Sequence, residues 1–172
     1  MKKFFHFFIM FFVSTLTFIK PTTFPKAIKK LNDPTITKLN LNFSETLSDE
    51  EIQYLARAIR KNKTVTKLRL NFSGNRIGNI GVQALAKTFK NNSTITKLNL
   101  DLDNSQIGND GVQASANIIL NNTTITNIGL TLYSNQIDNA GAQALVNALQ
   151  TNSTITKLYL NLGGNSIGLE GI

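Results

Sequence analysis

Apolar and polar residues alternate along short stretches of this chain, and each stretch is followed by apolar residues at a different spacing. Leu68, Leu70 and Phe72 alternate with polar neighbours, which is the two-residue period of a strand with one buried face. Further on, residues 82, 85, 86 and 89 are apolar at the spacing of one helix face. The pattern therefore predicts a strand followed by a short helix.

This strand and helix unit recurs along the chain. Its first strand leucine aligns with Leu39, Leu68, Leu98, Ile128 and Leu158, at spacings of 29, 30, 30 and 30 residues. A fixed period of this length indicates a solenoid of stacked units. An asparagine and two glycines recur, with losses, between strand and helix, and polar Asn-rich turns follow the helices. In the first repeat, residues 48–51 (Ser-Asp-Glu-Glu) predict a capped helix start.

Together, these residues resemble leucine-rich repeats of the ribonuclease-inhibitor type, and the resemblance covers residues 35–172. It implies an α/β fold, a right-handed solenoid or horseshoe arc with parallel strands on the concave face and short helices on the convex face. About four full repeats and a truncated fifth are expected. In that family the turn asparagine follows a strand leucine by three residues, whereas Asn75 follows Leu70 by five. Because the alternation continues through Phe72, we predict a longer strand rather than a bulge.

Two segments precede the repeats. Residues 1–20 have a basic start and a mostly apolar run over residues 4–19, which is typical of a signal peptide or signal-anchor. That run is shorter than the roughly 20 residues of a membrane-spanning helix. The alternative is a compositionally biased segment ahead of an intracellular domain. Residues 21–34 predict a linker and an N-terminal capping helix that ends before Pro34, which leaves residues 35–172 as the repeat domain.

Localisation depends on the first of these segments. We expect a secreted or membrane-anchored protein if residues 1–20 act as a signal, and a cytoplasmic protein otherwise. Any membrane association is expected only through residues 4–19. The strand beginning at Leu158 is followed by too little chain for a further helix, so the chain is either a fragment lacking later repeats or one whose end pairs with something else.

The composition leaves little catalytic chemistry. The chain has no cysteine, and its single histidine is His6, so the repeats cannot supply a thiolate nucleophile, a Ser-His-Asp triad or a histidine metal site. We therefore expect no enzyme activity, no metal and no cofactor. The formal charge of +8 falls to +3 from residue 34 onward, where 12 basic residues face nine acidic ones. This weak and interrupted basic charge does not favour nucleic-acid binding.

The outward strand positions form the candidate site. In a parallel sheet they make a continuous array on the concave face, with a basic side, an acidic middle and an aromatic side. The candidate partner-binding residues are Lys67, Arg69, Asn71, Asn99, Asp101, Asp103, Thr131, Tyr133 and Tyr159. Tyrosine and arginine are enriched among residues that anchor protein interfaces. For each residue the alternative is a solvated polar position without a partner.

The leading hypothesis is a noncatalytic protein–protein interaction module, a monomer that binds a protein partner of unknown identity through the concave face. A second hypothesis comes from resemblance to GTPase-activating proteins for Ran, with Arg69 or Arg76 as a stimulating arginine. A third is a fragment of a larger leucine-rich-repeat receptor or kinase-linked chain.

Asparagine also occurs in glycosylation sequons. The eight Asn-x-Ser/Thr sites begin at Asn42, Asn62, Asn71, Asn91, Asn92, Asn121, Asn122 and Asn152. Most lie in the turns that follow the helices, where asparagine suits turn geometry. In a secreted chain they would be glycan acceptors, and a glycan on Asn42 or Asn71 would crowd the concave face.

Overall fold

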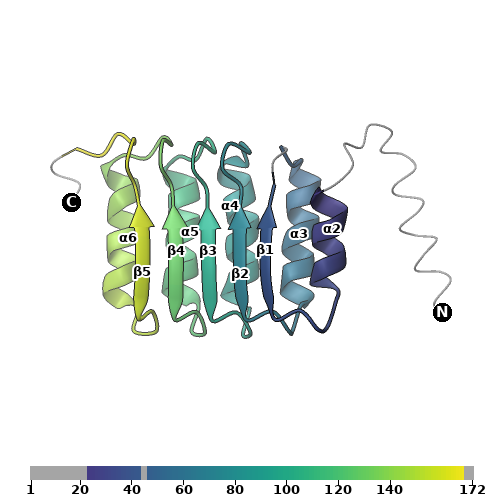
Figure 1. The fold of residues 1–172 in the computed structure, drawn as a ribbon. Helices are drawn as coiled ribbons and strands as arrows, with labels where there is room; N and C mark the ends of the chain where they lie inside the picture. Colours follow the sequence, from purple (N-terminus) through teal and green to yellow (C-terminus); the bar gives the residue numbers. More distant parts are fainter. Residues whose placement is uncertain (1–22, 44–45, 169–172) are drawn as a thin grey trace.

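The computed structural model describes residues 23–43 and 46–168, and Figure 1 shows strands and helices in strict alternation after a first helix. The predicted signal segment, the start of the predicted linker and the last four residues lie outside the described residues. In chain order the elements are α2 (Thr23–Leu31), β1 (Lys38–Asn42), α3 (Asp49–Lys61), β2 (Lys67–Asn71), α4 (Gly78–Lys90), β3 (Lys97–Asp101), α5 (Asn109–Asn121), β4 (Asn127–Thr131), α6 (Asn139–Thr151) and β5 (Lys157–Asn161).

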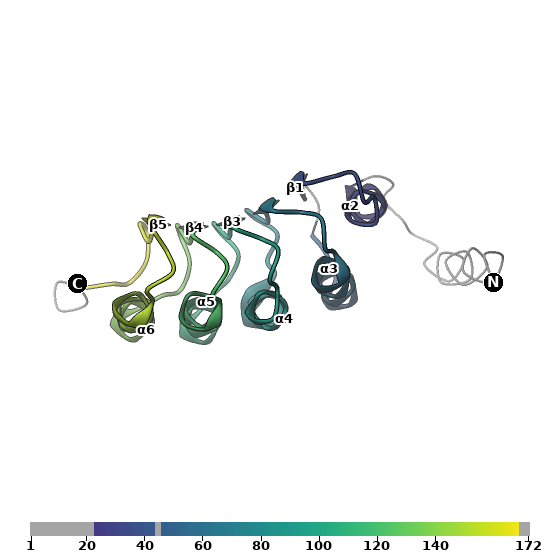
Figure 2. The same cartoon turned by 90° about the horizontal axis from the view of Figure 1, so that it is seen from below.

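The five strands form one parallel sheet in the order β1-β2-β3-β4-β5. Each strand pairs with the next at the same repeat position, for example Leu68 with Leu98. Figure 2 shows the strands in one layer and the helices in a second, more widely spaced layer, so the strand layer is the inner side of the arc. The predicted leucine-rich-repeat solenoid is confirmed, with four strand and helix units and a fifth strand among the described residues.

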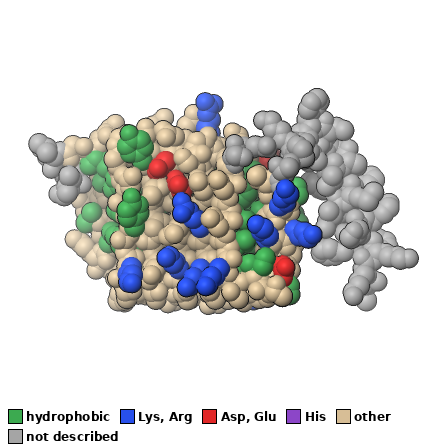
Figure 3. All heavy atoms as spheres, viewed as in Figure 1, with side chains coloured by type: hydrophobic (Ala, Val, Ile, Leu, Met, Phe, Trp, Pro, Cys, Tyr) green, Lys and Arg blue, Asp and Glu red, His purple; other side chains and the backbone are tan. Residues whose placement is uncertain are grey.

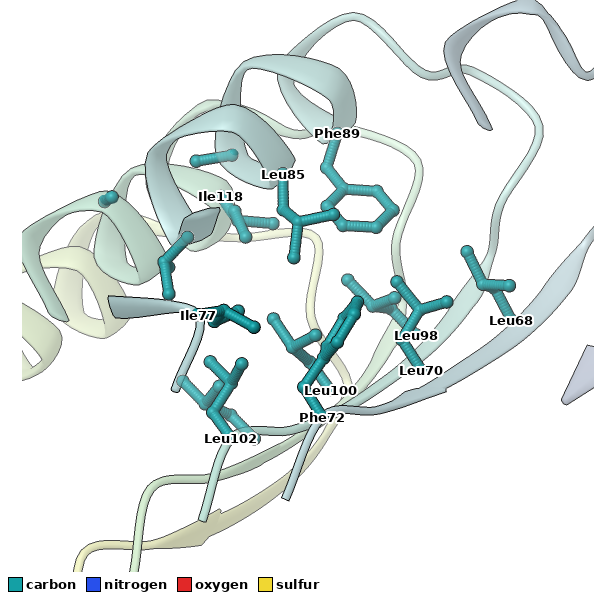
Figure 4. Packing of buried hydrophobic residues seen from close by; sticks show 14 of the residues in the cluster. Leu68, Leu70, Phe72, Ile77, Leu85, Phe89, Leu98, Leu100, Leu102 and Ile118 are labelled. Atoms are coloured by element: carbon teal, nitrogen blue, oxygen red, sulfur yellow. The ribbon is translucent and has the colours of Figure 1, made fainter. Parts of the chain in front are cut away.

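The core lies between the two layers. Leu70 and Phe72 point from the strand side toward Leu85 and Phe89 of α4 (Figure 4), and all four are fully buried. Equivalent residues stack from repeat to repeat, as Phe43 does on Phe72 with ring centroids 5.0 Å apart. Because each unit completes the burial of its apolar side chains by stacking on its neighbours, the repeats stabilise one another.

The predicted longer strand is wrong. Strand β2 ends at Asn71, whose side-chain Oδ1 accepts a hydrogen bond of 2.9 Å from the N–H of Ser73 and turns the chain. The alternation itself persists, because the Phe72 side chain is buried and its N–H still donates to the Asp101 carbonyl at 2.9 Å. Phe72 therefore belongs to the core although it lies beyond the strand.

Helix α2 covers the β1 end of the solenoid. Ala27 and Leu31 are buried in the common core, and the Phe24 ring meets the Tyr54 ring of α3 edge-on at 6.1 Å. The helix ends before Pro34, as predicted. The predicted capping box of α3 is also present, with Ser48 and Glu51 satisfying each other's backbone N–H groups.

Buried asparagines connect successive repeats at the turns after the helices. Asn122 is 3% exposed, its Oδ1 accepts from the N–H groups of Thr124 and Ile125, and its Nδ2 donates to the Phe89 carbonyl of the preceding repeat. Asn62 and Asn152 donate backward in the same way. A glycan attaches to this same Nδ2 atom, and the Nδ2 of buried Asn122 already donates two hydrogen bonds, so a glycan on Asn122 would break one of them.

A second asparagine series lies in the turns after the strands. The Oδ1 of Asn135 accepts from the N–H groups of Ser105 and Ile107 in the preceding repeat, each at 3.0 Å, and its Nδ2 donates to the Leu102 carbonyl. Asn75 has the same role two repeats earlier, and Asn165 has it one repeat later. These bonds fix the turns that follow the strands.

No helix within the described residues is long and apolar enough to cross a membrane.

Candidate protein-binding face

The strand face consists of four rows of side chains that run across the sheet. Parallel pairing without a register shift aligns the first, third and fifth residues of all five strands. A fourth row follows the strands at Ser73, Asp103, Tyr133 and Gly163, where backbone bonds such as Asn104 N–H to the Tyr133 carbonyl, 2.9 Å, keep the repeats aligned. We call these four rows the concave face.

Basic side chains occupy the edge at which the strands begin. The first row contains Lys38, Lys67, Lys97 and Lys157, interrupted by Asn127. These four lysines are exposed, and Figure 3 shows blue side chains along this edge. Arg69 adds an exposed positive charge in the second row, paired across the sheet with Asn99.

Two carboxylates lie near the middle of the concave face. Asp101 accepts a hydrogen bond of 3.0 Å from the Thr131 hydroxyl, and Asp103 accepts one of 2.8 Å from the Tyr133 N–H. Both aspartates are half-buried, and both donors come from the next repeat. The two carboxylates are thus held in place before any partner arrives, which reduces the entropy that binding must overcome.

Exposed tyrosines lie toward β5, next to glycines. Tyr133 is 47% exposed and Tyr159 is 63% exposed. Gly129 is the cross-strand neighbour of Tyr159, and a Cβ atom there would lie 2.7 Å from the Asn99 Oδ1, so the Asn99 side chain would have to shift. At Gly163 a Cβ atom would lie 3.2 Å from the Tyr133 ring. Asn99 thus lies next to Gly129, and the Tyr133 ring lies next to Gly163.

All nine candidate residues lie on this face. Seven are on strands, and Asp103 and Tyr133 lie two residues beyond the ends of β3 and β4. The sequence pattern did not single out Gly129 and Gly163, which shape the aromatic side. They could have been found from the sequence, because the equivalent positions of the other repeats carry larger side chains. Among the described residues, no group of three or more His, Cys, Asp or Glu side chains could hold a metal ion. The concave face is an open surface of hydrogen-bonding, charged and aromatic groups.

This fold and face define a leucine-rich-repeat protein-interaction domain. Residues 21–168 match the family model described as the TMOD/LMOD leucine-rich domain, so the chain belongs to that family. This family is a noncatalytic one, which confirms the expectation that the chain is not an enzyme. The leucine-rich-repeat identification is confirmed as well, whereas the ribonuclease-inhibitor subtype and the signal segment remain predictions.

Among solved structures, the chain is similar to leiomodin-1 actin-binding site 2. The two share 25% sequence identity and superpose with a TM-score of 0.63, over 83% of this chain and 81% of that chain. No match was found among curated protein sequences.

Proposed function

We propose that this chain is a noncatalytic module that binds actin through its concave face. The observation that carries the proposal is the concave face itself, a continuous surface with cations on one edge, two fixed carboxylates in the middle and two exposed tyrosines at the other side. The identity of the partner is supported by the similarity to a structure described as an actin-binding site.

The arrangement suits a protein partner better than a small molecule. The exposed rings of Tyr133 and Tyr159 offer apolar area that a partner can bury, and aromatic anchors of this kind contribute most of the binding energy in many interfaces. Arg69 and the lysine row favour acidic groups on the partner, while Asp101 and Asp103 select against a second acidic group at the centre. The remaining candidate residues, Asn71, Asn99 and Thr131, supply hydrogen bonds between these charges.

The test is binding of the full chain to actin monomers and filaments. In the variant Arg69→Gln/Tyr133→Ser/Tyr159→Ser, one cation and two exposed rings are removed from the concave face. We expect binding at least about tenfold weaker, because truncation of interface anchors typically costs one to several kcal/mol. Fluorescence anisotropy with labelled monomers and cosedimentation with filaments both measure this change.

A matched control removes similar groups from the helix side. In Lys90→Gln/Ile80→Ser/Leu120→Ser one exposed cation is lost together with apolar side chains that are 61% and 45% exposed. We expect this variant to bind actin as the unchanged chain does. Weaker binding by the control alone would place the partner on the helices, and absence of any binding by the unchanged chain would exclude actin.

A further inference from the structure

A groove separates α3 and α4 on the convex side, opposite the concave face. It is an open hollow of about 350 Å³. Helix α3 lines it with Ala56, Arg57 and Arg60 among others, and helix α4 lines it with Ile80, Ala84 and Lys87 among others. On each helix the residues follow helical spacing, so two aligned faces form the walls.

The groove has a rigid floor. The Thr88 hydroxyl donates to the Ala56 carbonyl of α3 and to the Ala84 carbonyl of its own helix, both at 3.1 Å. The small side chains of Ala56 and Ala84 leave the space above this link open. A ligand would therefore meet a preformed surface.

The walls are basic, with one apolar residue. Arg57, Arg60 and Lys87 are exposed around the groove, and Ile80 is 61% exposed. Helix α4 has no acidic residue, and the acidic residues of α3 lie in its first turn, away from Arg57 and Arg60. The charge of the groove is thus not balanced by the helices that form it.

The groove between α5 and α6 provides an internal comparison. It occupies the same place two repeats later, is smaller at about 180 Å³, and carries Asn117, Leu120 and Asn147 at positions equivalent to Arg57, Arg60 and Lys87. Basic residues near a helix C-terminus can offset the helix dipole, but α5 and α6 have the same length as α3 and α4 and no basic residue in their last turns. Helix formation therefore does not require the basic groups of the first groove.

We propose that the groove between α3 and α4 docks a short segment of a partner protein that carries several acidic side chains and one aliphatic side chain. The acidic groups pair with Arg57, Arg60 and Lys87, and the aliphatic group covers Ile80 above the alanine floor. This contact lies on the face opposite the proposed actin-binding surface, so the domain can hold two protein segments at once.

The probe is a fluorescein-labelled peptide, Asp-Glu-Leu-Asp-Glu, titrated with the full chain and followed by fluorescence polarisation. The variant Arg57→Gln/Arg60→Gln/Lys87→Gln is expected to bind about tenfold more weakly, the size expected for three exposed ion pairs. Binding should also weaken as salt is added. Ile80→Ser is expected to reduce the affinity for this peptide but not for a Leu-to-Gln version of it.

The matched control is Lys61→Gln/Lys63→Gln/Lys90→Gln. It removes the same charge from exposed positions on or beside the same helices, outside the groove. If the control variant still binds the peptide, the result supports docking in the groove. If both triple variants lose the same affinity for the peptide, the attraction is nonspecific and the proposal is overturned. Phosphatidylserine vesicles that bind with the same residue dependence, more tightly than the peptide, would overturn it as well. Arg69→Gln/Tyr133→Ser/Tyr159→Ser should bind the peptide normally, so this proposal and the concave-face proposal fail separately.

Discussion

At the scale of single residues, asparagine connects this fold from repeat to repeat. Asn122 is buried, yet its side chain makes hydrogen bonds in both directions along the chain, to its own turn and to the carbonyls of Phe89 and Asn92. A buried polar side chain is tolerated only when its groups are satisfied. The bonds to the preceding repeat therefore contribute to stability only while the two repeats stay stacked on each other.

Replacing Asn122 with alanine should destabilise the domain by about 2–4 kcal/mol, because buried N–H and carbonyl groups lose their partners. Urea unfolding followed by circular dichroism measures the change in free energy of unfolding. Asn121→Ala is the control, since Asn121 is exposed and bonds only within its own helix. We expect the control to change stability by less than about 0.5 kcal/mol. Similar losses in the two variants would refute the role of the buried asparagine.

The sequence predicted that these asparagines form turns, but it did not predict their hydrogen bonds to the preceding repeat. Turn chemistry accounts for the bonds from Asn122 to Thr124 and Ile125, which are two and three residues away. The bond to Phe89 joins residues 33 positions apart, and it depends on how far one repeat rises over the last. That rise is set by helix and strand packing, which the local pattern does not contain.

At the scale of elements, the helix starts depend on glycine for space. The Asn79 Oδ1 accepts from the N–H groups of Gly108 and Gly111 in the next repeat, at 2.9 and 3.1 Å. A Cβ atom on Gly111 would lie 2.6 Å from that oxygen and 2.6 Å from the Ile107 Cγ2. The sequence shows a recurring glycine at this position, and the structure shows that close approach, not an unusual backbone angle, favours it here.

Gly111→Ala should therefore destabilise the domain by about 1–3 kcal/mol, the range for overpacked positions. Gly108→Ala is a suitable comparison, because a Cβ atom there would meet nothing closer than the Asn79 Nδ2 at 3.7 Å. We expect the second variant to unfold at nearly the same temperature as the unchanged chain. A Gly111→Ala variant as stable as Gly108→Ala would contradict the close contact.

The start of α6 should depend on pH. Asp138 caps this helix, and the bond that its carboxylate accepts from the Ala140 N–H, with a second from the Asn109 side chain, lowers the pKa of Asp138 below its ordinary value. A lowered pKa stabilises the fold above the unfolded value of about 3.9, and this contribution is lost as the pH falls through the lowered pKa. Thermal melts from neutral to acidic pH should show that Asp138→Asn lowers the melting temperature at neutral pH and that the difference shrinks in acid. A difference in melting temperature that stayed the same at every pH would argue against a stabilising role of the Asp138 carboxylate.

At the scale of the whole molecule, burial changes along the solenoid. Equivalent strand positions are fully buried in the middle and open near β5, where Leu158 is 43% exposed while Leu98 is 0% exposed. The repeat period predicted that these two residues are equivalent in the sequence, and the alternation predicted that both face inward. Neither pattern could predict that Leu98 and Leu158 differ in burial, because burial depends on which neighbouring units are stacked against each strand.

The same substitution at both positions tests this difference. Leu98→Asp places an unpaired charge in the middle of the core, costs several kcal/mol and should leave the domain unfolded at room temperature. Leu158→Asp leaves the charge partly in water, so we expect a folded domain with a modestly lower melting temperature. Circular dichroism reports the strand and helix content of each variant. If Leu98→Asp melted like the unchanged chain, the central core would be wrongly assigned, and if Leu158→Asp unfolded completely, the β5 layer would contribute far more to the cooperative fold than its exposure indicates.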